Sequence, residues 1–157
     1  PSSHESTIKE IRIGEELISE ATYEQSVTVS LNDEIDISRG DMIVQKDDSL
    51  TSTKNFTANV CWLSESNMNL NRTYLIMHTT RLSKAKISSI NNKININTLD
   101  TEQANELKTN DIANISFKLA QPLIVDQYSQ NRSTGAFIII DETTYHTVGA
   151  GMIETIE

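Results

Sequence analysis

Residues 131–141 read NRSTGAFIIID and residues 147–153 read TVGAGMI, and these two segments decide the fold. The first opens with a cluster of turn-forming residues and continues into a short apolar, β-branched run. That run, Ala136 to Ile140, is apolar on both faces, which predicts a strand covered on both sides. In the second segment Gly149 and Gly151 interrupt a strand-like pattern. Glycines at such places mark a β-bulge or the close approach of another part of the chain.

The hydrophobic period in the rest of the chain is mostly two. Such alternation marks half-buried strands, because successive side chains point to opposite faces of a sheet. It is clearest at residues 27–32, 56–63, 94–97 and 114–119. Helix signals are few. Residues 101–107 (TEQANEL) are polar with good helix formers, and Asp100 is a candidate cap, so we expect one or two helical turns there.

A polar stretch at residues 46–53 (KDDSLTST) divides the chain, and we place the domain boundary after residue 48. Residues 1–48 hold about three strands, too few to close a barrel. One of these is a strand that turns at Ile11–Glu15 (IRIGE). Residues 49–157 hold about seven or eight strand candidates, enough for a closed antiparallel barrel of about six strands. The sequence therefore predicts an all-β chain.

The core of the predicted barrel is drawn from the apolar faces of these strands. We expect it to contain Phe56, Val60, Trp62, Leu75, Met77, Ile87, Ile115, Phe117, Leu119, Ile138, Ile140 and Val148. His78 is expected to be packed or hydrogen-bonded within a strand. We expect Gly149-Ala150-Gly151 to serve barrel closure rather than ligand binding, and a side chain at Gly149 to be costly if its φ is positive.

Composition limits the partners and the compartment. The chain has 22 acidic and 13 basic residues and a formal charge of -9, which disfavours nucleic acid as a direct partner. Cys61 is the only cysteine, so neither an internal disulfide nor a cysteine metal cluster is possible. No secretory signal opens the sequence, and its longest apolar run is too short to span a bilayer. We expect a cytoplasmic protein without a membrane partner.

Signatures of catalysis or nucleotide binding are lacking in the sequence. No Gly-Lys-Ser/Thr tripeptide of a phosphate-binding loop occurs, and Asn92–Asn95 (NKIN) has Asn where a guanine-binding motif has Asp. His4, His78 and His146 do not have the spacing of metal ligands. The prediction is that this chain has no catalytic, cofactor-binding or metal-binding residues.

Four segments together resemble one family. They are DEIDISRGDMIV at 33–44, HTTR at 78–81, NRSTGAFIIID at 131–141 and TVGAGMI at 147–153. In this order they resemble the C-terminal region of the GTP-binding (large) subunit of bacterial sulfate adenylyltransferase. TVGAGMI is also similar to the last strand of the third domain of elongation factor Tu. The resemblance implies a barrel of the elongation-factor-Tu C-terminal-domain type, preceded by part of a second translation-protein barrel with a strand around Arg39-Gly40-Asp41. Within this segment we expect Gly40 to supply a turn conformation that other residues resist.

The resemblance also implies a function. In that family GTP hydrolysis in a G domain, which holds GTP and Mg, drives formation of adenosine 5'-phosphosulfate and diphosphate from ATP and sulfate. The barrels would serve assembly and coupling, with the G domain in cis and the small ATP-sulfurylase subunit in trans as partners. The alternative is an elongation-factor-like barrel that binds aminoacyl-tRNA. The alternative needs a basic stripe, for which Arg72, Arg81, Lys84 and Lys86 are the dense candidates.

Overall fold

The computed structural model describes residues 4–48 and 50–157, and it separates into two compact units between Asp47 and Asp48. In these ranges every regular element is a β-strand, so the predicted all-β class is confirmed. A helix able to cross a membrane is lacking from the described ranges. The predicted division after residue 48 lies next to the observed one. The assignment of the units to the second and third domains of a translation-type GTPase stays a prediction.

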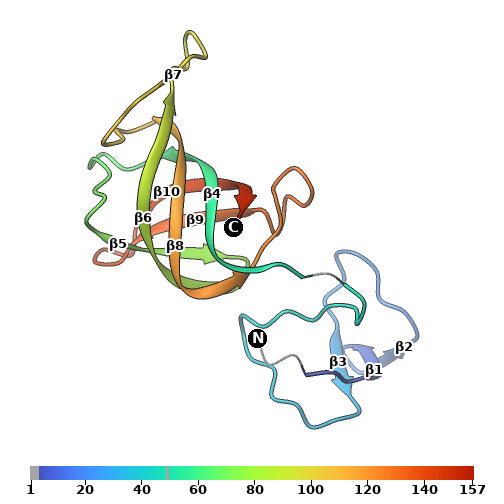
Figure 1. Ribbon diagram of the computed structural model, residues 1–157. Helices are drawn as coiled ribbons and strands as arrows, with labels where there is room; N and C mark the ends of the chain where they lie inside the picture. Colours follow the sequence, from blue (N-terminus) through green and yellow to red (C-terminus); the bar gives the residue numbers. More distant parts are fainter. Residues whose placement is uncertain (1–3, 49) are drawn as a thin grey trace. The chain divides into compact units, whose positions relative to one another are not determined.

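The first unit contains a small antiparallel sheet in the order β2-β1-β3 (Figure 1). Its strands are β1 (Ile8–Ile13), β2 (Glu16–Ile18) and β3 (Thr28–Leu31). Gly14 has a φ of 60° in the turn between β1 and β2, where a residue without a side chain meets the least steric resistance. The strand and turn expected from IRIGE are therefore confirmed.

The strand expected around Arg39-Gly40-Asp41 is not formed, because Arg39 and Asp41 make only an isolated bridge. The turn conformation expected at Gly40 is confirmed, since Gly40 has a φ of 102°. The Asp41 carboxylate accepts a hydrogen bond from the backbone N–H of Ser38 at 2.9 Å, and Asp41 N–H donates to Ser38 O at 3.0 Å. The backbone polar groups of this segment are therefore satisfied within a closed turn, and not by pairing with a neighbouring strand.

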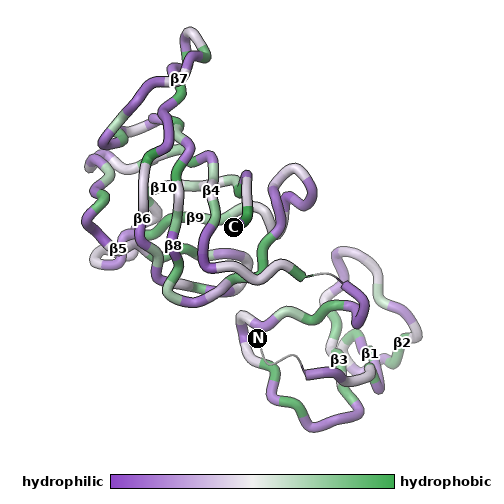
Figure 2. The backbone as a smooth tube through the Cα atoms, in the orientation of Figure 1, coloured by the Kyte–Doolittle hydropathy of each residue, from purple (hydrophilic) through white to green (hydrophobic). Residues whose placement is uncertain are grey.

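The second unit is a closed six-stranded antiparallel barrel in the order β5-β9-β10-β4-β8-β6, with β6 returning to β5 (Figure 1). Hydrophobic and hydrophilic residues alternate along its long strands (Figure 2), so each strand turns one face inward. The strands are β4 (Ser52–Trp62), β5 (Thr73–His78), β6 (Arg81–Ile94), β7 (Thr101–Glu102), β8 (Ile112–Ile124), β9 (Ala136–Asp141) and β10 (Thr147–Ile156). The short β7 extends β6 outside the closed ring.

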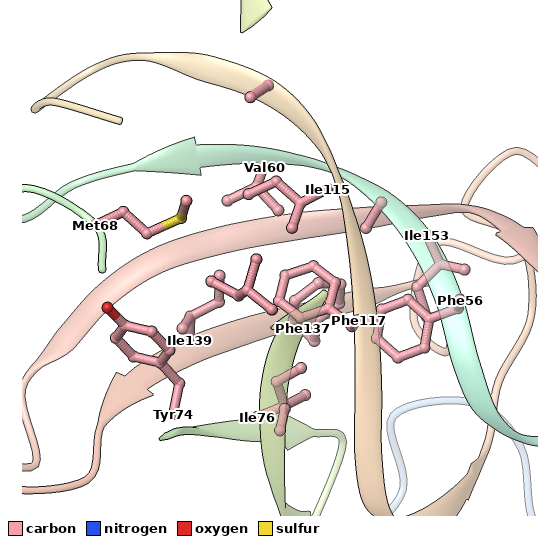
Figure 3. Packing of buried hydrophobic residues seen from close by; sticks show 14 of the residues in the cluster. Phe56, Val60, Met68, Tyr74, Ile76, Ile115, Phe117, Phe137, Ile139 and Ile153 are labelled. Carbon is pink, nitrogen blue, oxygen red and sulfur yellow. The ribbon is translucent and has the colours of Figure 1, made fainter. Parts of the chain in front are cut away.

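Three phenylalanines form the centre of the core. The ring centroids of Phe56, Phe117 and Phe137 lie 5.3–5.4 Å apart, in tilted and edge-on arrangements (Figure 3). The predicted members found in this core are Phe56, Val60, Trp62, Ile87, Ile115, Phe117, Leu119 and Val148. His78 is also buried, and its Nε2 lies 2.7 Å from Thr134 O, as expected for a packed strand residue.

The remaining four predicted core residues lie on the face of β5 and β9 that turns away from the main core cluster, which takes Tyr74, Ile76, Phe137 and Ile139 instead. Leu75 and Ile140 are nevertheless buried, as predicted, whereas Met77 and Ile138 are only half-buried. Both faces of these strands are apolar, so the pattern does not say which face turns inward. A one-residue change of register exchanges the two faces completely.

The helix expected at residues 101–107 is also wrong. Thr101 and Glu102 pair with β6 as β7, and Leu107 is fully buried in the core. Lys93 holds the base of this connection, because its Nζ lies 3.3 Å from Glu102 Oε1 and 3.2 Å from Asp111 Oδ1. Strand pairing and the burial of one leucine outweigh a helix propensity that is weak per residue.

The glycines of TVGAG lie at a bulge and at close contacts, the two features that the sequence predicted for them, whereas their need for barrel closure stays a prediction. The pairing of β10 with β9 shifts register between Thr147 and Gly149, so a bulge is present. A Cβ at Gly149 would lie 3.1 Å from Cys61 O, and one at Gly151 only 2.3 Å from Phe137 Cζ. Gly149 is not among the described glycines with positive φ. Close approach, and not backbone conformation, therefore requires glycine here.

Candidate functional site

A row of apolar side chains crosses five strands on the outer face of the barrel. Met77 on β5 is opposite Ile138 on β9, which is opposite Ala150 on β10. Ala150 is opposite Cys61 on β4, and Cys61 is opposite Ile112 on β8. All five are half-buried. Residues directly opposite each other in a sheet share a face, so these side chains form a continuous apolar band.

The band forms a groove of about 580 Å³. Ala150, the smallest side chain of the row, lies between Ile138 and Cys61, which leaves a depression over β10. Met152 contributes a further apolar side chain, 44% exposed. Unbranched methionine and small residues at a groove allow it to adapt to a partner's shape. We call this the outer groove; it is lined by Asn59, Val60, Cys61, Met77, Thr79, Ile112, Tyr128, Ala136, Phe137, Ile138, Ala150, Gly151 and Met152.

The sequence TVGAGM builds the core and the outer groove together. Strand alternation turns Gly151 inward, where the Phe137 ring occupies the space that a side chain would need. Ala150 and Met152 then point outward into the groove. The inward residues of the motif thus pack the core, and its outward residues line the candidate site.

A polar network borders the outer groove on β4, β8 and β10. Asn114 donates from Nδ2 to Asn59 Oδ1 at 3.1 Å and also to the Glu154 carboxylate. Asn91 on β6 donates to Asn114 Oδ1 at 2.7 Å. An apolar centre with a hydrogen-bonding border is the usual anatomy of a protein–protein interface.

The charged groups near β5 and β9 are structural. Arg72 Nη1 lies 2.9 Å from Asp141 Oδ2. Hydrogen bonds from the backbone of Thr144 and of Thr143, with the nearby Arg72, hold the pKa of Asp141 below its usual range. This carboxylate closes the turn between β9 and β10.

The candidate basic stripe is partly neutralised. Arg72 is paired with Asp141, and Lys84 is paired with Glu142. The hydrogen bond to Glu142 raises the pKa of the Lys84 ammonium. Pairing of two of the four candidate cations with carboxylates reduces the field available to a phosphate backbone.

The other residues considered from sequence lie apart from the outer groove or have structural partners. His4 and His146 are exposed, and Lys93 of the NKIN segment is in the ion pairs described above. In the described ranges no group of three or more His, Cys, Asp or Glu side chains could hold a metal ion. The outer groove was not predicted from the sequence. The feature that could have indicated it is the run Ala136–Ile140, which is apolar on both faces.

A family model for the GTP-eEF1A C-terminal domain-like family matches residues 55–154. This chain belongs to that family. The match spans the barrel from β4 to β10, including both segments that decided the fold. It agrees with the prediction of an elongation-factor-type C-terminal barrel.

Several curated relatives of this GTP-eEF1A C-terminal domain-like chain share one name. This chain is 42% identical over 153 residues to "Sulfate adenylyltransferase subunit 1" of Psychromonas ingrahamii, and the match covers 98% of the chain and 33% of the relative. The protein of the same name from Shewanella woodyi is also 42% identical over 153 residues, with the same coverage. The chain thus spans about a third of the length of the curated relatives it matches, and the family resemblance read from the sequence is confirmed.

Solved structures show the same fold. Sup35 complexed with GDP matches with a TM-score of 0.83 at 15% identity, covering 97% of this chain and 38% of that chain. Sup35 complexed with GMPPNP matches with a TM-score of 0.84 at 14% identity and the same coverage. At this identity the likeness is one of fold alone.

Proposed function

We propose that this chain is a non-catalytic β-barrel region of the GTP-binding subunit of a sulfate adenylyltransferase, serving assembly and coupling. The parent protein would act in the cytoplasm, where ATP and sulfate are converted to adenosine 5'-phosphosulfate and diphosphate. GTP and Mg would be held by a G domain outside this chain. The outer groove, in a chain 42% identical over 153 residues to a protein named subunit 1, is the observation that carries the proposal.

The groove supports docking because strand β9 is apolar on both faces. Its inner side chains Phe137 and Ile139 are buried in the core, whereas Ile138 on the outer face is only half-buried. Covering apolar surface is favourable by roughly 25 cal/mol per Å². A strand with this composition is typical of one covered on both sides, so we expect a partner to supply the second cover.

The proposed occupant of the outer groove is the G domain in cis. The curated relatives are about three times as long as the matched segment, so most of such a polypeptide lies outside it. A G domain whose fit to the groove differs between its GTP and GDP states would pass its nucleotide state to the barrel. Such coupling requires only a difference in contact free energy between the two states.

The test of the groove uses a matched pair of substitutions. Ile138→Glu places a charge in the groove and should abolish association of the chain with a separately produced G domain, measured by sedimentation. The barrel should stay folded, because the side chain is half-exposed. Ser88→Glu, on the exposed face of β6 away from the groove, should associate normally. Equal association of both variants would remove the groove from the proposal.

A second pair of measurements addresses chemistry and the alternative partner. The chain alone should give no saturable heat on calorimetric titration with GTP or GDP, because it lacks a phosphate-binding loop. Micromolar affinity would show that a nucleotide site lies within it. Tight binding of aminoacyl-tRNA that falls steeply with added salt would favour the translation-factor alternative. The neutralised cations Arg72 and Lys84 argue against that outcome.

A further inference from the structure

The connection between β6 and β7 projects from one end of the barrel and ends in a tip at residues 95–100 (Figure 1). The tip presents two large apolar side chains to solvent. Ile96 is 63% exposed and Leu99 is 77% exposed. Connections of this kind are usually polar, and neither side chain belongs to the core cluster.

The tip is ordered by its own hydrogen bonds. The side-chain oxygen of Asn95 accepts from the backbone N–H groups of Asn97 at 3.0 Å and Thr98 at 3.4 Å. The backbone N–H of Leu99 donates to Asn95 O at 2.7 Å. Leu99 has a φ of 63°, a conformation that a leucine adopts only at a conformational cost. The fold therefore holds an exposed leucine in a strained backbone conformation. This side chain contributes nothing to the packing of the barrel.

The base of the projection is fixed to the barrel. Asn95 N–H donates to Asp100 O at 2.9 Å, closing the neck of the tip. Below it, the ion pairs of Lys93 with Glu102 and Asp111 join β6, β7 and the start of β8. An element held at its neck and base loses little conformational entropy on binding, and such preorganisation favours affinity.

We propose that Ile96 and Leu99 form a docking knob that inserts into an apolar pocket on a second protein subunit. The inference rests on the proposed function, because the relatives' name, subunit 1, implies at least one further subunit. Two apolar anchors in a border of Asn97, Asp100 and other polar groups match the anatomy of an interface hot spot. The pocket of the partner should have an apolar floor and a rim of hydrogen-bond donors, including a cation opposite Asp100. A projecting element can insert into a pocket on a separate chain, and it is therefore better suited to such a partner than a flat surface that packs against its own chain.

The test compares three asparagine substitutions for binding to the small subunit of sulfate adenylyltransferase from the same organism, by calorimetry. Leu99→Asn and Ile96→Asn should each weaken binding by at least about tenfold, since hot-spot residues contribute this much or more. Tyr145→Asn is the matched control. Tyr145 is 71% exposed at a φ of 59° in the turn between β9 and β10, so it shares the exposure and backbone conformation of Leu99.

Unfolding in urea separates binding from folding. Leu99→Asn should keep or raise the unfolding midpoint, because asparagine tolerates positive φ better than leucine. If the unaltered chain does not bind the small subunit, the proposed assembly of this chain with that subunit is refuted. If it binds and the tip variants bind equally well, only the knob is refuted. Loss of self-association in the tip variants, with unchanged subunit binding, would identify a second copy of this chain as the occupant and overturn the proposal.

Discussion

Replacing Gly151 by alanine should destabilise the barrel, because the new Cβ would meet the Phe137 ring. It would lie 2.3 Å from Cζ, 2.8 Å from Cε1 and 2.9 Å from Cε2. Ordinary contact begins at 3.4 Å, so the ring would have to retreat by about 1 Å, since 3.4 minus 2.3 is 1.1. Phe137 is 4% exposed, and the rings of Phe56 and Phe117 stand against it at 5.3 and 5.4 Å.

The expected cost follows from these contacts. Overpacking a full core costs about 1–3 kcal/mol, and the reduced freedom of alanine in the unfolded chain returns about 0.4–1 kcal/mol. We therefore expect Gly151→Ala to lower the free energy of unfolding by about 1–2 kcal/mol. Gly149→Ala should cost less, because its Cβ would lie 3.1 Å from Cys61 O and 3.2 Å from Ile139 Cδ1, which small shifts can relieve.

Urea unfolding followed by tryptophan fluorescence measures this directly. Trp62 is the only tryptophan in the chain and is 2% exposed in the barrel, so its signal reports barrel unfolding. The double variant Gly151→Ala/Phe137→Leu should be about 1 kcal/mol more stable than the sum of the single effects predicts, because a shorter side chain removes the clash. Strict additivity, or equal costs for Gly149→Ala and Gly151→Ala, would refute the role given to the Phe137 contact.

Two further predictions concern the connections of the barrel. Leu107→Ala should lower the free energy of unfolding by about 2–4 kcal/mol in the same assay, because it empties a fully buried position. A loss below about 1 kcal/mol would mean that the connection between β7 and β8 does not anchor the barrel. Asp141 has a lowered pKa, so its charged form contributes stability above the usual carboxyl pKa of about 4, and this is lost as the pH falls through the folded-state value. Asp141→Asn should therefore be less stable than the unaltered chain at pH 7, and the difference should shrink near pH 3; a difference that does not change with pH would contradict the role given to the charge.

The all-β architecture could be predicted from sequence because strand periodicity is a local property. Alternation along Phe56–Trp62 and Ile115–Leu119 placed side chains such as Trp62 and Phe117 correctly in the core. The turn at Gly14 and the close approach at Gly151 were also readable, since glycine within a strand-like pattern usually marks a turn, a bulge or a close contact. The motif TVGAGMI predicted an elongation-factor-type C-terminal barrel, which the match at residues 55–154 confirmed. Together with NRSTGAFIIID and the other two segments it predicted the sulfate adenylyltransferase resemblance, which the curated relatives confirmed.

The helix expected at residues 101–107 failed because nonlocal contacts decided that segment. Leu107 is buried among side chains from other strands, and Glu102 is paired with Lys93 on β6. Neither contact has a signature in the segment itself, whereas the helix propensity does. Local preference is easily overridden when a buried apolar contact is available.

The sequence by itself determined that this chain forms strands, that the strands close into a barrel, and which family the barrel belongs to. Only the tertiary structure decided which face of β9 is the core. Ala136–Ile140 is apolar at every position, so the choice between Ile138 and Ile139 depends on the register against Ala150 and Met77 on neighbouring strands. Register is a relation between distant segments and reverses both faces at once. For that reason the outer groove became visible only in the folded barrel.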